Sequence, residues 1–409
     1  MTQDTAAMRQ YALVTGNYWT FTLTDGALRM LVVLYFHQLG YAPLAIALLF
    51  LFYEFFGVVT NLVGGWLGAR IGLNRTMNIG LALQVMALGM LAAPAEWLNV
   101  PYVMAAQALS GIAKDLNKMS AKSSVKLLAG SGGESWLYRW VALLTGSKNA
   151  LKGVGFFVGG ALLASVGFQN SMLAMAAVLV LILGGSLLWL QRDLGIATKK
   201  AKFRDIFSKS RAINQLSAAR LFLFGARDIW FVVALPVFMS EALGWSHLQV
   251  GSFMACWVIG YGLVQSIAPA LTGKRAAHPP DGGSALRWAL ALMLVPTAIA
   301  LGLDRVPTEP LLVGGLLLFG VVFALNSALH SYLILSYASA DGVSLDVGFY
   351  YMANAAGRLL GTLLSGWLYQ QWGLAACLWG SALMLLLTVG ISTALPRLKP
   401  LPQAEKSPH

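Results

Sequence analysis

Charged side chains recur inside the long apolar stretches of this chain, where burying a charge is costly. An ionisable residue at the centre of a membrane-spanning helix costs about 2.5–3.5 kcal/mol on insertion scales, and it usually faces a partner or a water-filled path. These residues are therefore the first candidates for a functional site. The basic set is Arg29, Lys114, Lys118, Lys148, Lys152, Arg220, Arg227 and Arg358, and the acidic set is Asp25, Glu54, Asp115 and Asp228.

The spacing of the basic residues places pairs of them on one face of a helix. Two pairs are four residues apart and one pair is seven apart, which corresponds to one and two helical turns. These pairs are Lys114 and Lys118, Lys148 and Lys152, and Arg220 and Arg227. Arginine binds phosphate and carboxylate through paired donors, and lysine adds a compact positive charge. The pattern predicts a cavity that attracts anions, and the alternative is that these charges only pair with one another.

The predicted binding residues come from both halves of the chain. Lys118 and Lys148 are set aside because long lysine side chains can reach the membrane surface. Arg29 and Arg227 lie near the middle of the first span of each half, so we expect them to hold an anion from two sides. The full predicted set for substrate binding is Arg29, Lys114, Lys152, Arg220, Arg227, Arg358, Asn326 and His330.

The four acids are predicted to pair with the cations or to carry protons. Asp25 and Arg29 are four residues apart, so one interpretation is that they neutralise each other. Glu54 has no basic residue within four positions of the chain, and burial favours the protonated form of a carboxyl. Glu54 is therefore the first candidate for proton coupling, ahead of Asp25, Asp115 and Asp228.

The composition indicates which elements position these residues. The chain has 409 residues, of which 58% are hydrophobic and 11% are charged, whereas soluble domains carry about 25% charged residues. Apolar runs long enough to cross a bilayer as helices recur along its length. The predicted fold class is an all-α polytopic membrane protein with twelve transmembrane helices in two six-helix bundles. The expected spans are 11–38, 43–69, 75–94, 101–127, 137–165, 168–190, 213–240, 245–271, 286–303, 310–337, 346–371 and 374–395.

The longest charged stretch, "QRDLGIATKKAKFRDIFSKSR", separates six of these spans from the other six. Lys and Arg gather in alternate loops, and such loops lie on the cytoplasmic side. We therefore expect an inner-membrane protein with both termini cytoplasmic, and the net charge of +12 reflects topology rather than a nucleic-acid partner. The predicted organisation is a cytoplasmic N-terminus at 1–10, a six-helix bundle at 11–190, a basic linker at 191–212, a second six-helix bundle at 213–395 and a cytoplasmic tail at 396–409.

The sequence gives no sign of an enzyme, a metal site or a cofactor. The two cysteines, Cys256 and Cys377, and the five scattered histidines show no metal-ligand spacing. No ATP-binding loop of the form GxxxxGK[ST] is present, and no nucleophile can be aligned with a base. A small anionic solute and the lipid bilayer are the predicted partners. A receptor or scaffold without transport is a further alternative.

One loop carries a motif with a family resemblance. The stretch "GGWLGARIGLNRT" resembles the loop motif of the major facilitator superfamily, with Gly65, Arg70, Gly72 and Arg75 at matching positions and Ala69 where the family has an acid. The resemblance implies the major facilitator fold and a role for this loop in latching the two bundles. The absence of the acid predicts that the latch is not formed in the usual way.

Longer stretches resemble the ArsJ family of organoarsenical efflux permeases, among them "TLTDGALRMLVVLYFHQLGY" and "WVALLTGSKNALKGVGFF". The resemblance implies efflux of 1-arseno-3-phosphoglycerate, which confers arsenate resistance. It also implies a functional partnership with glyceraldehyde-3-phosphate dehydrogenase, the enzyme that makes this ester from arsenate. The alternative within transport is a general proton-coupled exporter of drugs, sugars or organophosphates.

Overall fold

The computed structural model describes residues 3–41, 49–128, 133–191, 194–197, 210–245, 247–272 and 280–397. All regular secondary structure in these ranges is helical, as the composition predicts. The first half contains α1 (Gln3–Gln38), α3 (Leu51–Ile71), α4 (Leu73–Leu91), α5 (Val100–Leu128), α6 (Gly133–Val166) and α7 (Phe168–Trp189), with a short 3₁₀ turn at Ala95–Trp97. The second half contains α8 (Arg211–Phe231), α9 (Ala234–Glu241), α10 (His247–Thr272), α11 (Gly282–Gly302), α12 (Thr308–Tyr337) and α13 (Val343–Ser392).

The last helix, α13, contains two of the predicted spans. Its helical geometry is interrupted at Gly373, where φ is 72° and ψ is −168°. Glycine adopts this conformation without the steric cost that a Cβ would bring. The chain therefore turns between the spans predicted at 346–371 and 374–395. The span predicted at 213–240 is divided in the structure, since α8 ends at Phe231 and α9 begins at Ala234.

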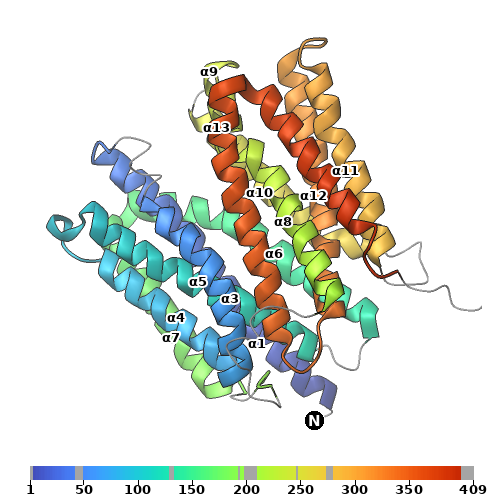
Figure 1. Ribbon diagram of the computed structural model, residues 1–409. Helices are drawn as coiled ribbons and strands as arrows, with labels where there is room; N and C mark the ends of the chain where they lie inside the picture. Colours follow the sequence, from blue (N-terminus) through green and yellow to red (C-terminus); the bar gives the residue numbers. More distant parts are fainter. Residues whose placement is uncertain are drawn as a thin grey trace, which may run out of the picture.

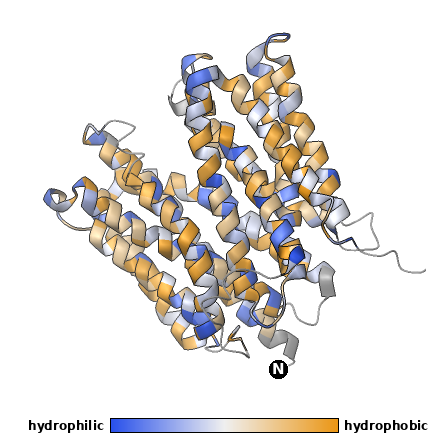
Figure 2. Ribbon diagram, in the orientation of Figure 1, coloured by the Kyte–Doolittle hydropathy of each residue, from blue (hydrophilic) through white to orange (hydrophobic). Residues whose placement is uncertain are grey.

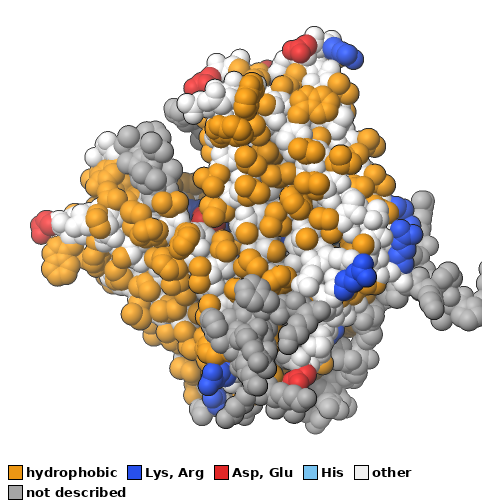
Figure 3. Space-filling model, viewed as in Figure 1, with side chains coloured by type: hydrophobic (Ala, Val, Ile, Leu, Met, Phe, Trp, Pro, Cys, Tyr) orange, Lys and Arg blue, Asp and Glu red, His pale blue; other side chains and the backbone are white. Residues whose placement is uncertain are grey.

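The outer surface of the molecule is apolar and its interior contains polar side chains. Figure 3 shows hydrophobic side chains over most of the visible face, with Lys, Arg, Asp and Glu mainly toward the ends of the molecule, and Figure 2 shows hydrophobic residues along most of each helix. Leu181 and Leu188 are 76% and 78% exposed, whereas Asn61 and Gln265 are fully buried. This arrangement suits a hydrocarbon surrounding. Among the described residues, seven helices are long and apolar enough to cross a membrane, and the chain is an integral membrane protein.

The two halves approach closely at one end of the molecule. Gly65 of α3 packs against the backbone of Gly348 in α13, and Gly146 of α6 packs in the same way against Gly262 of α10. Side-chain hydrogen bonds accompany these contacts, such as the 2.9 Å bond between the hydroxyls of Tyr138 and Thr272. Figure 1 shows the halves close together in the lower part of the view, near the N-terminus, and diverging in the upper part.

The loop motif lies at the closely packed end. Gly72 separates α3 from α4 with φ at 98°, which explains the glycine at this position. The segment 194–197 lies along the loop, because the amide of Leu73 donates to the carbonyl of Leu194 (2.8 Å) and the amide of Ala197 donates to that of Ala69 (2.9 Å). The guanidinium of Arg70 lies 5.2 Å from the centre of the Trp66 ring. The latch role of Gly65, Arg70, Gly72 and Arg75 stays a prediction. Residues 192–193 and 198–209 of the predicted linker, and the tail from 398, lie outside the described residues.

Replacing Gly65 with valine is expected to lower the thermal unfolding midpoint of the purified protein. An added Cβ would overlap the carbonyl oxygen of Ser344 and crowd Gly348, and overpacking of this kind costs about 1–3 kcal/mol. Valine at Gly89, in a helix interior with open space around the new Cβ, is the matched control. Equal midpoints for the two variants would contradict the close packing of α3 on α13.

Candidate functional site

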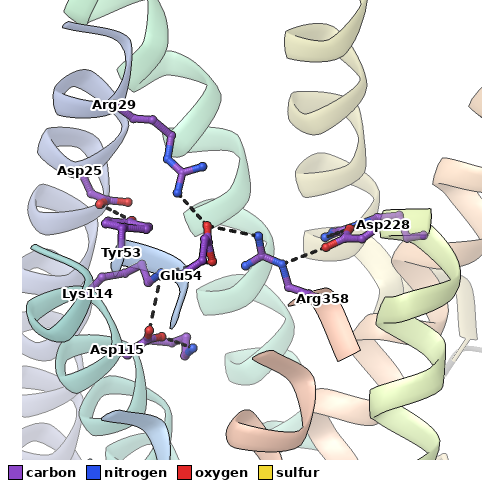
Figure 4. A network of polar contacts seen from close by, with 10 residues as sticks. Asp25, Arg29, Tyr53, Glu54, Lys114, Asp115, Asp228 and Arg358 are labelled. Atoms are coloured by element: carbon purple, nitrogen blue, oxygen red, sulfur yellow. Dashed lines mark hydrogen bonds and ion pairs between the residues drawn. The ribbon is translucent and has the colours of Figure 1, made fainter. Parts of the chain in front are cut away.

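A network of charged side chains lies between the two halves, with the carboxylate of Glu54 at its centre (Figure 4). Nη2 of Arg29 in α1 donates to Oε1 of Glu54 at 2.9 Å. Nη2 of Arg358 in α13 lies 3.6 Å from the same oxygen, and Nζ of Lys114 in α5 lies 4.0 Å from Oε2. One carboxylate on α3 therefore faces three cations from three other helices.

Arg358 extends the network into the second half. Its Nε donates to Oδ2 of Asp228 at 3.1 Å, while Nε of Arg227 donates to Oδ1 of the same carboxylate at 2.6 Å. The side chain of Arg358 consequently bridges Glu54 of the first half and Asp228 of the second. Arg29 of the first half and Arg358 of the second meet at Glu54, whereas Arg227, which the sequence predicted as the counterpart of Arg29, contacts Asp228 instead.

Further contacts fix the network within the first half. The hydroxyl of Tyr53 donates to Oδ1 of Asp25 at 2.6 Å, and the ring of Tyr53 lies 3.9 Å from Nζ of Lys114. Asp115 pairs with Lys114 at 3.5 Å and also with Lys118. The interpretation that Asp25 and Arg29 neutralise each other is not what the structure shows, because Asp25 accepts from Tyr53 while Arg29 turns to Glu54.

The network contains an exposed part and a buried part. The side chains of Glu54 and Arg358 are 33% and 34% exposed, and that of Arg29 is 26% exposed. Asp115 and Asp228 are almost completely buried. In Figure 3 a notch between the halves opens in the upper part of the view, with charged side chains at its base. Glu54, Arg29 and Arg358 are therefore accessible from the space between the halves. The buried carboxylates of Asp115 and Asp228 form ion pairs with cations of the network from the side away from this space.

Two lysines on α6 add positive charge to this region, and neither forms an ion pair with an acid among the described residues. Nζ of Lys148 donates to Oδ1 of Asn149 at 3.2 Å. Lys152 lies close enough to Arg29 and Asp25 for an electrostatic interaction with each of them. Lys152 was predicted from the sequence as a binding residue, and Lys148 was set aside. Both are half-buried and belong to the same charged region.

Three other predicted binding residues lie inside the second half and do not contact Glu54. Nε of Arg220 donates to Oδ1 of Asn354 at 2.9 Å, and its guanidinium lies 3.8 Å from the ring centre of Phe224. Asn326 donates to the carbonyl of Trp288 at 2.9 Å. His330 is fully buried, and neither ring nitrogen has a hydrogen-bond partner among the described residues. Their part in substrate binding stays a prediction.

Lys122 is not among the binding residues predicted from the sequence. The structure places this side chain in the interior, 5% exposed. Its Nζ donates to the hydroxyl of Tyr351 at 2.6 Å and to that of Thr145 at 3.0 Å, so it joins α5 to α13 across the two halves. A signal was present in the sequence, since Lys122 continues the four-residue spacing of Lys114 and Lys118.

The chemistry of this site is charge pairing and hydrogen bonding. No group of His, Cys, Asp and Glu in the described part of the chain could hold a metal ion. The network and the two neighbouring α6 lysines contain seven basic side chains (Arg29, Lys114, Lys118, Lys148, Lys152, Arg227 and Arg358) and four acids (Asp25, Glu54, Asp115 and Asp228). Such an excess of positive charge in a partly exposed site favours an anionic ligand.

Comparisons with known proteins agree with this fold. A family model described as Major Facilitator Superfamily matches residues 216–409. The comparison with curated proteins gives no match. Among solved structures, the human organic anion transporter MFSD10 (TETRAN) has a TM-score of 0.72 at 17% identity, and the likeness covers 93% of this chain and 99% of that one.

Two further structures are similar over nearly their whole length. A bacterial homologue of the iron transporter ferroportin in an outward-facing state has a TM-score of 0.73 at 13% identity, covering 94% of this chain and 98% of that one. The transporter FucP in an outward conformation has a TM-score of 0.72 at 11% identity, covering 96% and 100%. At these identities the likeness shows the fold, and the major facilitator fold predicted from the sequence is confirmed.

Proposed function

We propose that this chain, with its major facilitator fold, is a secondary transporter that exports an organic anion by alternating access. The single observation that carries the proposal is the group of cations from α1, α5 and α13 around one partly exposed carboxylate. Arginines from both halves meet there, so a ligand bound between them would contact both halves at once. A site of this kind couples binding to the relative movement of two bundles.

The arrangement of the halves supports alternating access. They pack closely at the end that carries the loop motif and diverge at the other end (Figure 1), and two of the similar structures are in outward-facing or outward conformations. In our proposal the closely packed end faces the cytoplasm together with both termini, and the protein lies in the inner membrane. The bias of Lys and Arg toward the loops of that end gives the same orientation.

We take the identity of the anion from the resemblance of several stretches of this chain to the ArsJ family. The proposed substrate is 1-arseno-3-phosphoglycerate, an ester that carries phosphate and arsenate oxygens. Such oxygens accept paired hydrogen bonds from arginine, and the site supplies Arg29 and Arg358 for this purpose. The human neighbour is an organic anion transporter by its description, which agrees with the proposed charge of the ligand. Arsenate resistance and a functional partnership with glyceraldehyde-3-phosphate dehydrogenase belong to the same proposal.

Arsenate tolerance of a sensitive bacterial strain tests this function. Cells that express the chain together with glyceraldehyde-3-phosphate dehydrogenase are expected to grow at higher arsenate concentrations than cells with either protein alone, because export removes the ester that the enzyme makes. Matched membrane levels of the chain are the control. Equal tolerance in all strains would reject the arsenical substrate, and protection without the enzyme would favour a general exporter of organophosphates.

A further inference from the structure

We propose that the carboxylate of Glu54 is a built-in occupant of the anion site, and that the transported anion displaces it. The inference rests on the proposed function and specifies how its site works. In the ligand-free protein Glu54 binds the cations that the substrate needs. In the loaded protein the phosphate or carboxylate group of the substrate takes over Arg29 and Arg358, and the side chain of Glu54 moves aside.

The geometry around Glu54 is that of an anion held by donors from both halves. Oε1 accepts from Arg29 at 2.9 Å and lies 3.6 Å from Nη2 of Arg358. Lys114 approaches Oε2 at 4.0 Å. A carboxylate or a phosphate of a ligand presents the same kind of oxygen to the same donors. The position of this carboxylate therefore marks where the anionic group of a ligand would lie.

Exposure distinguishes Glu54 from the neighbouring acids. Its side chain is 33% exposed, whereas those of Asp115 and Asp228 are 2% and 1% exposed. Asp115 is paired with two lysines of its own helix, and Asp228 with its neighbour Arg227 and with Arg358. An incoming anion can thus compete with Glu54 directly, while the other acids are shielded by the cations that they hold.

The site also has unused capacity for an anion. Nε of Arg29 is buried and has no hydrogen-bond partner among the described residues. Only part of the donor capacity of this guanidinium is therefore occupied by Glu54. Lys152 lies in electrostatic range of Arg29 without an acid bonded to it in the described part of the chain. A ligand with several oxygens would satisfy donors that a single carboxylate leaves open. The chemical class is therefore a multiply charged oxyanion, such as a phosphorylated organic acid, rather than a neutral sugar.

Displacement of an internal anion has a physical advantage for alternating access. The site must be enclosed between the halves both with and without substrate, and uncompensated charges in an enclosed, low-dielectric site are strongly unfavourable. Glu54 compensates Arg29 and Arg358 in the empty protein, and the substrate does so in the loaded protein. Both forms then avoid the cost of burying two unpaired guanidinium groups.

Binding measurements on the purified Glu54→Gln variant test the inference. We would titrate the full chain in detergent with 3-phosphoglycerate and, separately, with inorganic phosphate, by calorimetry at one ionic strength. Glutamine keeps the shape but removes the competing charge, so the dissociation constant for 3-phosphoglycerate is expected to fall about tenfold, which corresponds to about 1.4 kcal/mol. Glu96→Gln makes the same change at an exposed position of the 3₁₀ turn at Ala95–Trp97 and is expected to leave the constant unchanged.

Three results would overturn the inference or the function beneath it. Unchanged or weaker binding by a monodisperse Glu54→Gln protein, with binding by the unsubstituted chain, rejects the displacement of Glu54 alone. Absence of binding by both proteins rejects the proposed anion site itself. Should the glutamine variant fail to fold, Glu54→Asp keeps the charge but shortens its reach toward Arg358. That variant is expected to bind 3-phosphoglycerate a few-fold more tightly, and unchanged or weaker binding by it would reject the inference.

Discussion

The Arg358→Ala substitution is expected to reduce transport by about a hundredfold or more. Arg358 contacts Glu54 of the first half and Asp228 of the second, so its loss removes the donor that joins the halves at the proposed site. Truncating one partner of a hydrogen-bonded charge pair at a binding interface costs about 2–5 kcal/mol. A third of the Arg358 side chain is exposed, and we therefore expect an effect near the lower limit, where about 2.8 kcal/mol corresponds to a hundredfold change.

Uptake of labelled 3-phosphoglycerate into proteoliposomes measures this effect. Arg358→Lys keeps the charge without the planar fork and is expected to retain an intermediate rate. Arg305→Ala, a change at an exposed position between α11 and α12, is the control and should transport at the rate of the unsubstituted chain. A rate for Arg358→Ala equal to that of the control would contradict the role given to this arginine.

The Lys122→Met substitution is expected to slow transport, and the variant is expected to be at least as stable as the unsubstituted protein. The ammonium of Lys122 is buried between α5 and α13, and its partners are the hydroxyls of Tyr351 and Thr145. A lysine in a membrane interior costs about 2.5–3.5 kcal/mol, and the loss of two hydroxyl partners offsets part of this cost. An apolar side chain here favours the arrangement in which the two halves are closed at this end.

The expected loss follows from the populations of the two arrangements. If the conformation closed at the Lys122 end is stabilised by about 1.4 kcal/mol, the conformation open at that end becomes about ten times less populated. We would measure the thermal unfolding midpoint and the proteoliposome rate for Lys122→Met and for Lys122→Arg, which keeps the charge. A methionine variant with a lower midpoint, or one with an undiminished rate, would show that Lys122 has a purely structural role.

The helices could be predicted from the sequence because the bilayer imposes a length and a composition on each of them. The expected span at 168–190 corresponds to α7 at Phe168–Trp189, and that at 310–337 to α12 at Thr308–Tyr337. The interruption between Phe231 and Ala234 was not predicted. A signal was present in the sequence, because Pro236 stands four residues after Val232, and a proline cannot donate to the carbonyl four residues before it and clashes with that carbonyl in a continuous helix.

The charged residues of the site could be predicted, but their pairing could not. The cost of burying a charge singles out Arg29, Glu54 and Arg358 wherever they stand in an apolar run. Their partners depend on which helices pack together, and this information is not local in sequence. Glu54 was the first candidate for proton coupling because it lacks a basic neighbour along the chain. In the structure Arg29, Lys114 and Arg358 surround it, so that reason is wrong.

The glycine contacts between the halves bear on how easily the protein can cycle. At Gly65 and Gly348, and again at Gly146 and Gly262, main chain approaches main chain, and the side chain nearest to Gly146 is the small one of Ser266. When these surfaces part, the side-chain hydrogen bonds beside them must break, among them that of Tyr138 with Thr272, but no bulky side chain has to leave the glycine contacts themselves. The close backbone contact of α3 with α13 and that of α6 with α10 would then serve as two pivots about which the helical bundles rotate.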